Sequence, residues 1–145
     1  MTACAPGPGA DGNPPLVVEK SWPHGPRSAG RARRLLVSSL DTWSLPHLAD
    51  DAALVVSELV SNSVQHAREP RGHVIRTRFE RLDAAVRIEV HDANPGAPAP
   101  RTPTPDDESG RGLALVDSIT AGRWGVSERE GIGKMVWAVC TDGRA

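Results

Sequence analysis

Residues 51–67, DAALVVSELVSNSVQHA, decide the fold of this chain. Apolar residues recur every three or four positions in this segment, which predicts an amphipathic α-helix packed against a core. The predicted apolar face consists of Ala52, Val55, Val56, Leu59, Val60 and Val64. Beside that face, Glu58, Asn62 and His66 follow one another at intervals of four residues, so their side chains fall along one side of the helix.

Glu58 and Asn62 form the first candidate site. A carboxylate and an amide oxygen one turn apart can hold Mg²⁺ through water and orient a hydroxyl group for reaction. The same spacing also fits a solvated polar stripe on an ordinary helix, and a short isolated motif does not decide between the two interpretations. Further motifs are therefore needed, and they lie downstream.

A β-hairpin leads to the second motif. Residues 73–82 and 85–91 alternate apolar and polar side chains, which predicts two antiparallel strands joined by a tight connection. Asp92 stands where the second strand ends, and the turn sequence NPG follows at residues 94–96. Asp92 can serve as a ligand-binding carboxylate, or it can cap its own turn, while Gly96 lets the backbone approach a ligand closely.

A proline-rich loop leads to the third motif. Residues 97–109 are typical of a lid or binding loop, although a plain surface loop has the same composition. The loop ends in four residues that begin a predicted helix at about 113–120: Gly110, Arg111, Gly112 and Leu113. Glycines before a helix leave N–H groups free to bind an anion such as polyphosphate, with Arg111 adding a charge, but they also serve as simple caps.

The remaining elements are a strand at residues 16–22, a helix at 27–43, and two strands at 122–128 and 134–140. The outer face of the 27–43 helix is basic. Its arginines are Arg27, Arg31, Arg33 and Arg34. They form either a partner-protein surface or a solvated face.

Composition limits the function classes. The chain has 145 residues, for which we expect a disordered tail at 1–15 and a single domain at 16–141 with a lid at about 97–110. A net charge of −1 and 3% aromatic residues argue against nucleic-acid binding. Two distant cysteines indicate neither a disulfide framework nor a zinc site. No apolar run approaches the ~18 residues of a membrane helix and no signal peptide is evident, so we expect a cytoplasmic protein.

The three motifs occur in the order found in the GHKL ATP-binding superfamily, which this chain resembles. ELVSNSVQHA resembles the N box, DANPG the first glycine box, GRGLALV the second, and GKMVWAV the closing strand. Within the superfamily, the chain is most similar to the RsbW/SpoIIAB group of anti-sigma-factor serine kinases. The resemblance implies the Bergerat fold, an α/β (α+β) two-layer sandwich with helices on one face of a mixed, mainly antiparallel sheet.

The resemblance also implies that ATP and Mg²⁺ bind. Asn62 would help to ligate the Mg²⁺, Glu58 would orient or deprotonate the attacking hydroxyl group, and Asp92 would accept a hydrogen bond from the adenine amino group. The residues near the base and the phosphates would be His66, Gly96, Gly110, Arg111, Gly112 and Leu113. Relatives often have Thr in the closing strand where this chain has Met135, so the adenine pocket would lack one hydroxyl group.

The activity implied is that of a protein that binds a sigma factor and phosphorylates a serine on a small anti-sigma-factor antagonist. A homodimer through the first strand and helix would agree with the resemblance. The alternative is a catalytically inactive protein-binding module with the same fold, to which Met135 points. A plain α/β domain without a nucleotide site would require the three ordered motifs to coincide by chance.

Overall fold

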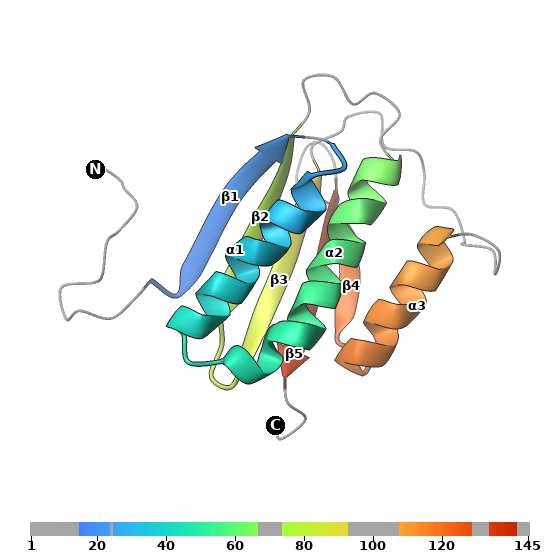
Figure 1. Ribbon diagram of the computed structural model, residues 1–145. Helices are drawn as coiled ribbons and strands as arrows, with labels where there is room; N and C mark the ends of the chain where they lie inside the picture. The colour runs from blue at the N-terminus through green and yellow to red at the C-terminus, as the bar shows by residue number, and fades with distance from the viewer. Residues whose placement is uncertain (1–14, 24, 67–73, 93–107, 129–133, 142–145) are drawn as a thin grey trace.

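Three α-helices cover one face of a five-stranded sheet (Figure 1). The computed structural model describes residues 15–23, 25–66, 74–92, 108–128 and 134–141. Within these residues the elements are β1 (Val17–Pro23), α1 (Ser28–Thr42), the 3₁₀ turn η1 (Pro46–Leu48), α2 (Ala49–His66), β2 (Val74–Arg81), β3 (Ala85–Asp92), α3 (Glu108–Thr120), β4 (Trp124–Glu128) and β5 (Lys134–Thr141). The two-layer α+β sandwich expected from the sequence is confirmed.

The strands lie in the order β1-β2-β3-β5-β4, and each neighbouring pair is antiparallel. The predicted hairpin is confirmed, with Phe79 of β2 opposite Ile88 of β3. The described strands contain no parallel pair, which differs from the mixed sheet that the resemblance implied. The reason is the connection between β1 and β2. Two helices, α1 and α2, run in opposite directions between them and return the chain antiparallel to β1.

The core lies between the helices and the sheet. Helix α2 buries Ala52, Val55, Val56, Leu59 and Val60, as its periodicity predicted. Helix α1 buries Ala32, Leu36 and Leu40, and the facing strand residues include Ile75, Phe79, Val86, Ile88, Val90, Val136 and Ala138. Full burial of a Val, Leu, Ile or Phe side chain contributes about 1.5–3 kcal/mol. Packing of these two faces therefore holds α2 against the sheet.

A tight turn connects α1 to α2. Ser44 adopts a left-handed φ of 61°, and the N–H of Leu45 donates a hydrogen bond of 2.8 Å to the carbonyl of Leu40. This pattern ends a helix because it satisfies a carbonyl of its last turn. Pro46 then begins η1, and Asp50 and Asp51 in the first turn of α2 suit the positive end of that helix's dipole.

Helix α3 begins at Glu108, whereas the sequence predicted a start near residue 113. Gly110, Arg111 and Gly112 therefore lie inside the first turns of the helix and not in a loop before it. Packing against α2 offsets the poor helix propensity of glycine. Residues 108–110 of the predicted lid thus belong to α3. The rest of that lid and residues 1–14 of the predicted tail lie outside the described residues.

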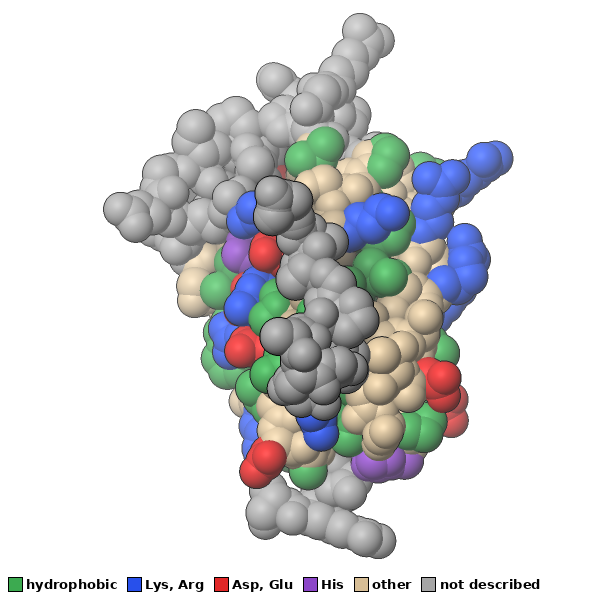
Figure 2. Space-filling model, turned by 90° about the vertical axis from the view of Figure 1, so that its left-hand side faces the viewer, with side chains coloured by type: hydrophobic (Ala, Val, Ile, Leu, Met, Phe, Trp, Pro, Cys, Tyr) green, Lys and Arg blue, Asp and Glu red, His purple; other side chains and the backbone are tan. Residues whose placement is uncertain are grey.

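The two faces of the molecule differ in charge (Figure 2). On the helical side, Arg27, Arg31, Arg33 and Arg34 are all exposed. On the opposite side, basic and acidic side chains of the sheet alternate. No helix in the described ranges combines the length and the apolar character needed to cross a lipid bilayer.

Candidate functional site

Three elements bring predicted site residues to one end of the molecule (Figure 1). In that view the last turns of α2 and the end of β3 lie at the top, and α3 begins to the right of α2. Helix α2 carries Glu58 and Asn62, β3 ends at Asp92, and Gly112 lies near the start of α3. Segments far apart in the sequence therefore meet at this end of the sandwich.

Glu58 lies against the backbone of α3. Glu58 and Asn62 are both half-buried, on the flank of α2 between its apolar face and solvent. A carbon added to the Cα of Gly112 would overlap Oε1 of Glu58 and lie 3.5 Å from its Cδ. Sequence reasoning missed this contact. The only signal for it was a glycine in a segment of helical periodicity, which often has a packing reason.

Asp92 is buried at the end of β3, with 5% of its surface exposed. Asp92 occupies every second position of β3 together with Val86, Ile88 and Val90, so all four side chains lie on the side of the sheet that faces the helices. Carboxylate oxygens at the edge of a core form stronger hydrogen bonds than they would in water, because the local dielectric constant is low. This position therefore suits recognition of an N–H group on a ligand.

The other predicted site residues are those at the start of α3, His66 and Gly96. Gly110 and Arg111 lie in the first turn of α3, and Leu113 packs half-buried against the core. His66 ends α2. The side chains of His66 and Arg111 lie outside the described part of the structure, as does all of Gly96. The first turn of α3 has free N–H groups and the positive end of the dipole, so the predicted anion-binding role now applies to a helix start at Glu108.

Met135 lies on the opposite side of the sheet from Asp92. In the pairing of β3 with β5, Met135 stands opposite His91, while Lys134 stands opposite Asp92. Directly paired residues share a face and consecutive residues alternate, so Met135 and His91 point away from the helices. The missing hydroxyl group at position 135 is therefore not a missing contact on the Asp92 side.

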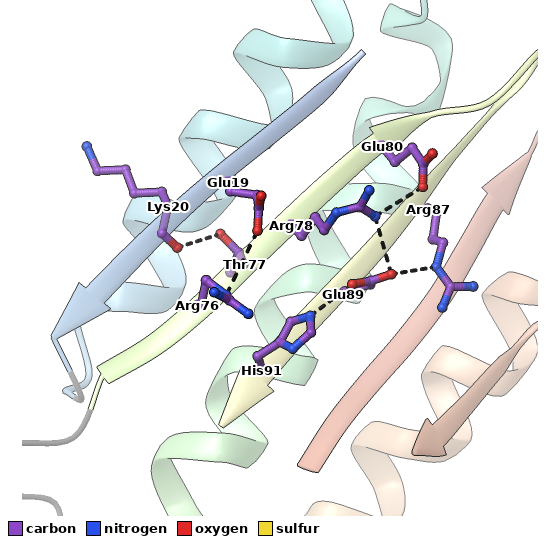
Figure 3. A network of polar contacts seen from close by, with 9 residues as sticks. All are labelled: Glu19, Lys20, Arg76, Thr77, Arg78, Glu80, Arg87, Glu89 and His91. Atoms are coloured by element: carbon purple, nitrogen blue, oxygen red, sulfur yellow. Dashed lines mark hydrogen bonds and ion pairs between the residues drawn. The ribbon is translucent and has the colours of Figure 1, made fainter. Parts of the chain in front are cut away.

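A network of charged side chains occupies the open face of the sheet, around the β3 residues that precede Asp92 (Figure 3). Oε2 of Glu89 accepts hydrogen bonds from Nε of Arg87 at 2.8 Å and from Arg78 at 3.4 Å. Nε2 of His91 lies 2.8 Å from Oε1 of Glu89. The guanidinium group of Arg87 also stacks over the Trp137 ring, 4.8 Å from its centroid. These contacts join β2, β3 and β5 and brace the strand that ends at Asp92.

The network determines the charge state of Glu89. Burial by itself would raise the pKa of this carboxyl group, but the hydrogen bonds from Arg87 and His91 and the charges of Arg87 and Arg78 outweigh it. The pKa of Glu89 is therefore lowered from its ordinary value of 4.5, and Glu89 is ionised at neutral pH.

The donor set on α2 can be compared with the needs of Mg²⁺. Within the described residues, no group of three or more His, Cys, Asp or Glu side chains is arranged to hold a metal ion. Mg²⁺ usually keeps several waters and binds one or two protein oxygens together with substrate phosphates. The Asn62 amide on α2, one turn from the Glu58 carboxylate, is an oxygen ligand of the kind that fits Mg²⁺ arriving with a polyphosphate.

Comparison with known proteins agrees with the fold. Residues 23–139 match the family described as the histidine kinase-like ATPase domain. In three dimensions the chain is similar to the histidine kinase domain of the blue-light activated histidine kinase EL346 from Erythrobacter litoralis, with a TM-score of 0.51 and 20% sequence identity. This likeness covers 80% of the chain but only 60% of the kinase domain, and at such low identity it concerns the fold. No curated protein sequence matches the chain.

Proposed function

The chain belongs to the histidine kinase-like ATPase domain family, and from that premise we propose that it binds ATP with Mg²⁺ and acts as a regulatory serine kinase of the anti-sigma-factor type. The observation that carries the proposal is the contact of Glu58 with Gly112 near the start of α3, with Asn62 one turn further along α2 and the buried Asp92 at the end of β3. A carboxylate, an amide, an anion-binding helix end and a buried acceptor are together the groups that nucleotide binding and phosphoryl transfer require.

Each group has one task in the proposed complex. Asp92 accepts a hydrogen bond from the adenine amino group, which distinguishes adenine from guanine. The first turn of α3 binds the phosphates through its free N–H groups. Asn62 helps to hold Mg²⁺, which when bound neutralises the phosphate charge.

Glu58 then acts on the acceptor hydroxyl group. The hydroxyl oxygen forms a bond to the γ-phosphorus as the bond from that phosphorus to the β,γ-bridging oxygen breaks, which releases ADP. The hydroxyl proton passes to the Glu58 carboxylate. Because the transition state of phosphoryl transfer is loose, a weak base in the correct position suffices.

A protein partner requires a surface outside the nucleotide site. Helix α1 carries three exposed arginines and a fourth, Arg27, at its N-cap, and its first turn has no acidic residue. Arg33 donates a hydrogen bond of 3.2 Å to Oγ of Ser57. This cationic surface suits an acidic protein, and in our proposal it receives the sigma factor or its antagonist (Figure 2).

Calorimetric titration with ATP, with and without Mg²⁺, tests the proposal on the wild type and on Asn62→Ala. We expect binding that depends on Mg²⁺ in the wild type and loses that dependence in the variant. Transfer of labelled γ-phosphate to serine is then measured with a panel of small anti-sigma-factor antagonists, with Glu58→Gln as the inactive control. If ATP does not bind at millimolar concentration, the proposal is wrong. ATP binding without transfer would favour the non-catalytic module.

A further inference from the structure

Gly112 leaves a space on α3 that the carboxylate of Glu58 occupies. Gly112 is buried and faces α2, and an added carbon at its Cα would overlap Oε1 of Glu58. Apart from proline, glycine is the poorest helix former. The structural reason for glycine at position 112 is therefore the absence of a side chain, which makes space for Glu58, and not helix propensity.

We propose that Gly112 is a positioning residue that holds Glu58 in place for catalysis. This inference rests on the proposed function, because it takes Glu58 as the base. The first turn of α3, which would bind the phosphates, directly precedes Gly112. The Glu58 carboxylate would therefore contact the same helix, α3, that binds the phosphates. This common contact would keep the carboxylate aligned with the phosphates, as phosphoryl transfer requires.

The atoms that a side chain at position 112 would meet distinguish a role in positioning Glu58 from a role in helix packing. Among the described residues, the atoms within 4 Å of a carbon added at Gly112 are Oε1 and Cδ of Glu58, outside the turns of α3 itself. Both atoms lie at the far end of a flexible side chain, so rotation of Glu58 can relieve the overlap without separating the helices. Gly112→Ala should therefore preserve the fold while displacing the carboxylate.

The experiment uses the full chain and four variants. Gly112→Ala tests the proposal, Glu58→Gln removes the base, and the double variant combines both changes. Ser118→Ala is the matched control, because Ser118 is exposed on the same helix. Thermal unfolding, ATP affinity and Mg²⁺-dependent turnover are measured for each. In the nucleotide-free wild type, NMR tests for a nuclear Overhauser effect between the Gly112 α-protons and the Glu58 γ-protons.

We expect the nuclear Overhauser effect in the wild type and a changed Glu58 environment in Gly112→Ala. The melting temperature of Gly112→Ala should be unchanged or raised, as for Ser118→Ala, and its ATP affinity should fall by less than its kcat. Its kcat should fall by about 100-fold, well beyond any change in affinity, which is the scale expected when a catalytic group is misplaced by about 1 Å. In the Glu58→Gln background, Gly112→Ala should cause no further loss, because the group it displaces is already inactive.

Three results would overturn the proposal. One is a Gly112→Ala variant with wild-type kcat. Another is loss of folding, or a loss of ATP affinity as large as the loss of kcat, which would assign Gly112 to helix packing or to phosphate contact. The third is absence of the nuclear Overhauser effect in the wild type, which would show that the two residues do not touch. If the wild type shows the nuclear Overhauser effect but neither binds nor turns over ATP, the proposed function is wrong. The contact between Gly112 and Glu58 would then exist, but it would have no catalytic role.

Discussion

Glu89 accepts a hydrogen bond of 2.8 Å from Nε of Arg87 on the sheet face that the helices leave open. Consecutive residues of a strand face opposite sides of the sheet. The network around Glu89 therefore lies on the open face of β3, and Asp92 at the end of the same strand lies on the face toward the helices. The stability of the open face and the geometry of the candidate adenine site are therefore linked through one strand.

Replacement of Glu89 by Gln should destabilise the fold at neutral pH. Hydrogen bonds to charged groups contribute about 1.5–3 kcal/mol, and we expect a loss of about that size in the free energy of unfolding. Because folding lowers the pKa of Glu89, this stabilisation is present above pH 4.5 and is lost as the pH falls through the lower, folded-state value.

Urea unfolding at neutral pH and at a pH below 4.5 measures this dependence. The gap between wild type and variant in the free energy of unfolding should close at the lower pH. Glu80→Gln is the control, because Glu80 contacts Arg78 with a third of its side chain exposed and should matter less. A gap that stays constant with pH would contradict the prediction.

Cys140 should be unreactive in the folded chain. Burial, with a smaller contribution from the charge of Asp51, raises the pKa of its thiol to about 12, so the reactive thiolate is scarce at ordinary pH. In a Cys4→Ser background, a thiol reagent should label the protein only after denaturation. The unfolded thiol loses its proton near pH 9.0, while the folded thiol keeps it until about 12, so this contribution to stability should decline across that interval. Rapid labelling of the native protein would show that the strand opens easily.

Arg31→Glu should stabilise α1 while weakening partner binding. The helix has no acidic residue in its first turn, and an acidic side chain near the positive end of the dipole contributes about 0.3–1 kcal/mol. Thermal unfolding at low ionic strength should detect the gain, and high salt should reduce it. Arg34→Glu is the control, because the dipole effect fades beyond the first turn. If the arginines are only a solvated face, binding of the unphosphorylated antagonist will be the same in wild type and variant.

Asp92→Asn should weaken ATP binding and reduce the preference for adenine. Loss of one charge-assisted hydrogen bond in a desolvated site should lower the affinity by at least about tenfold, which corresponds to about 1.4 kcal/mol. Calorimetry with ATP and with GTP measures both effects. Since the amide keeps the size of the carboxyl group, circular dichroism should report an intact fold. Equal affinities of wild type and variant for ATP would remove Asp92 from the nucleotide site.

The elements that the sequence predicted well are those with local rules. The apolar face of α2, its polar side with Glu58 and Asn62, and the hairpin that ends at Asp92 all follow from periodicity and turn residues within short windows. Even there, boundaries moved by a few residues, since helix ends depend on capping contacts. The start of α3 was misplaced because glycines counted as breakers until packing against α2 compensated for them.

By itself, then, the sequence determined which segments are helices and strands, which faces are apolar, and which polar residues stand beside them. Only the tertiary structure decided that β5 lies between β3 and β4, that Met135 faces away from Asp92, and that Glu58 rests on Gly112. The physical reason is the range of the interactions. Periodicity and capping act within a few residues, whereas strand register and helix contact depend on the burial of surfaces that the chain brings together only when it folds.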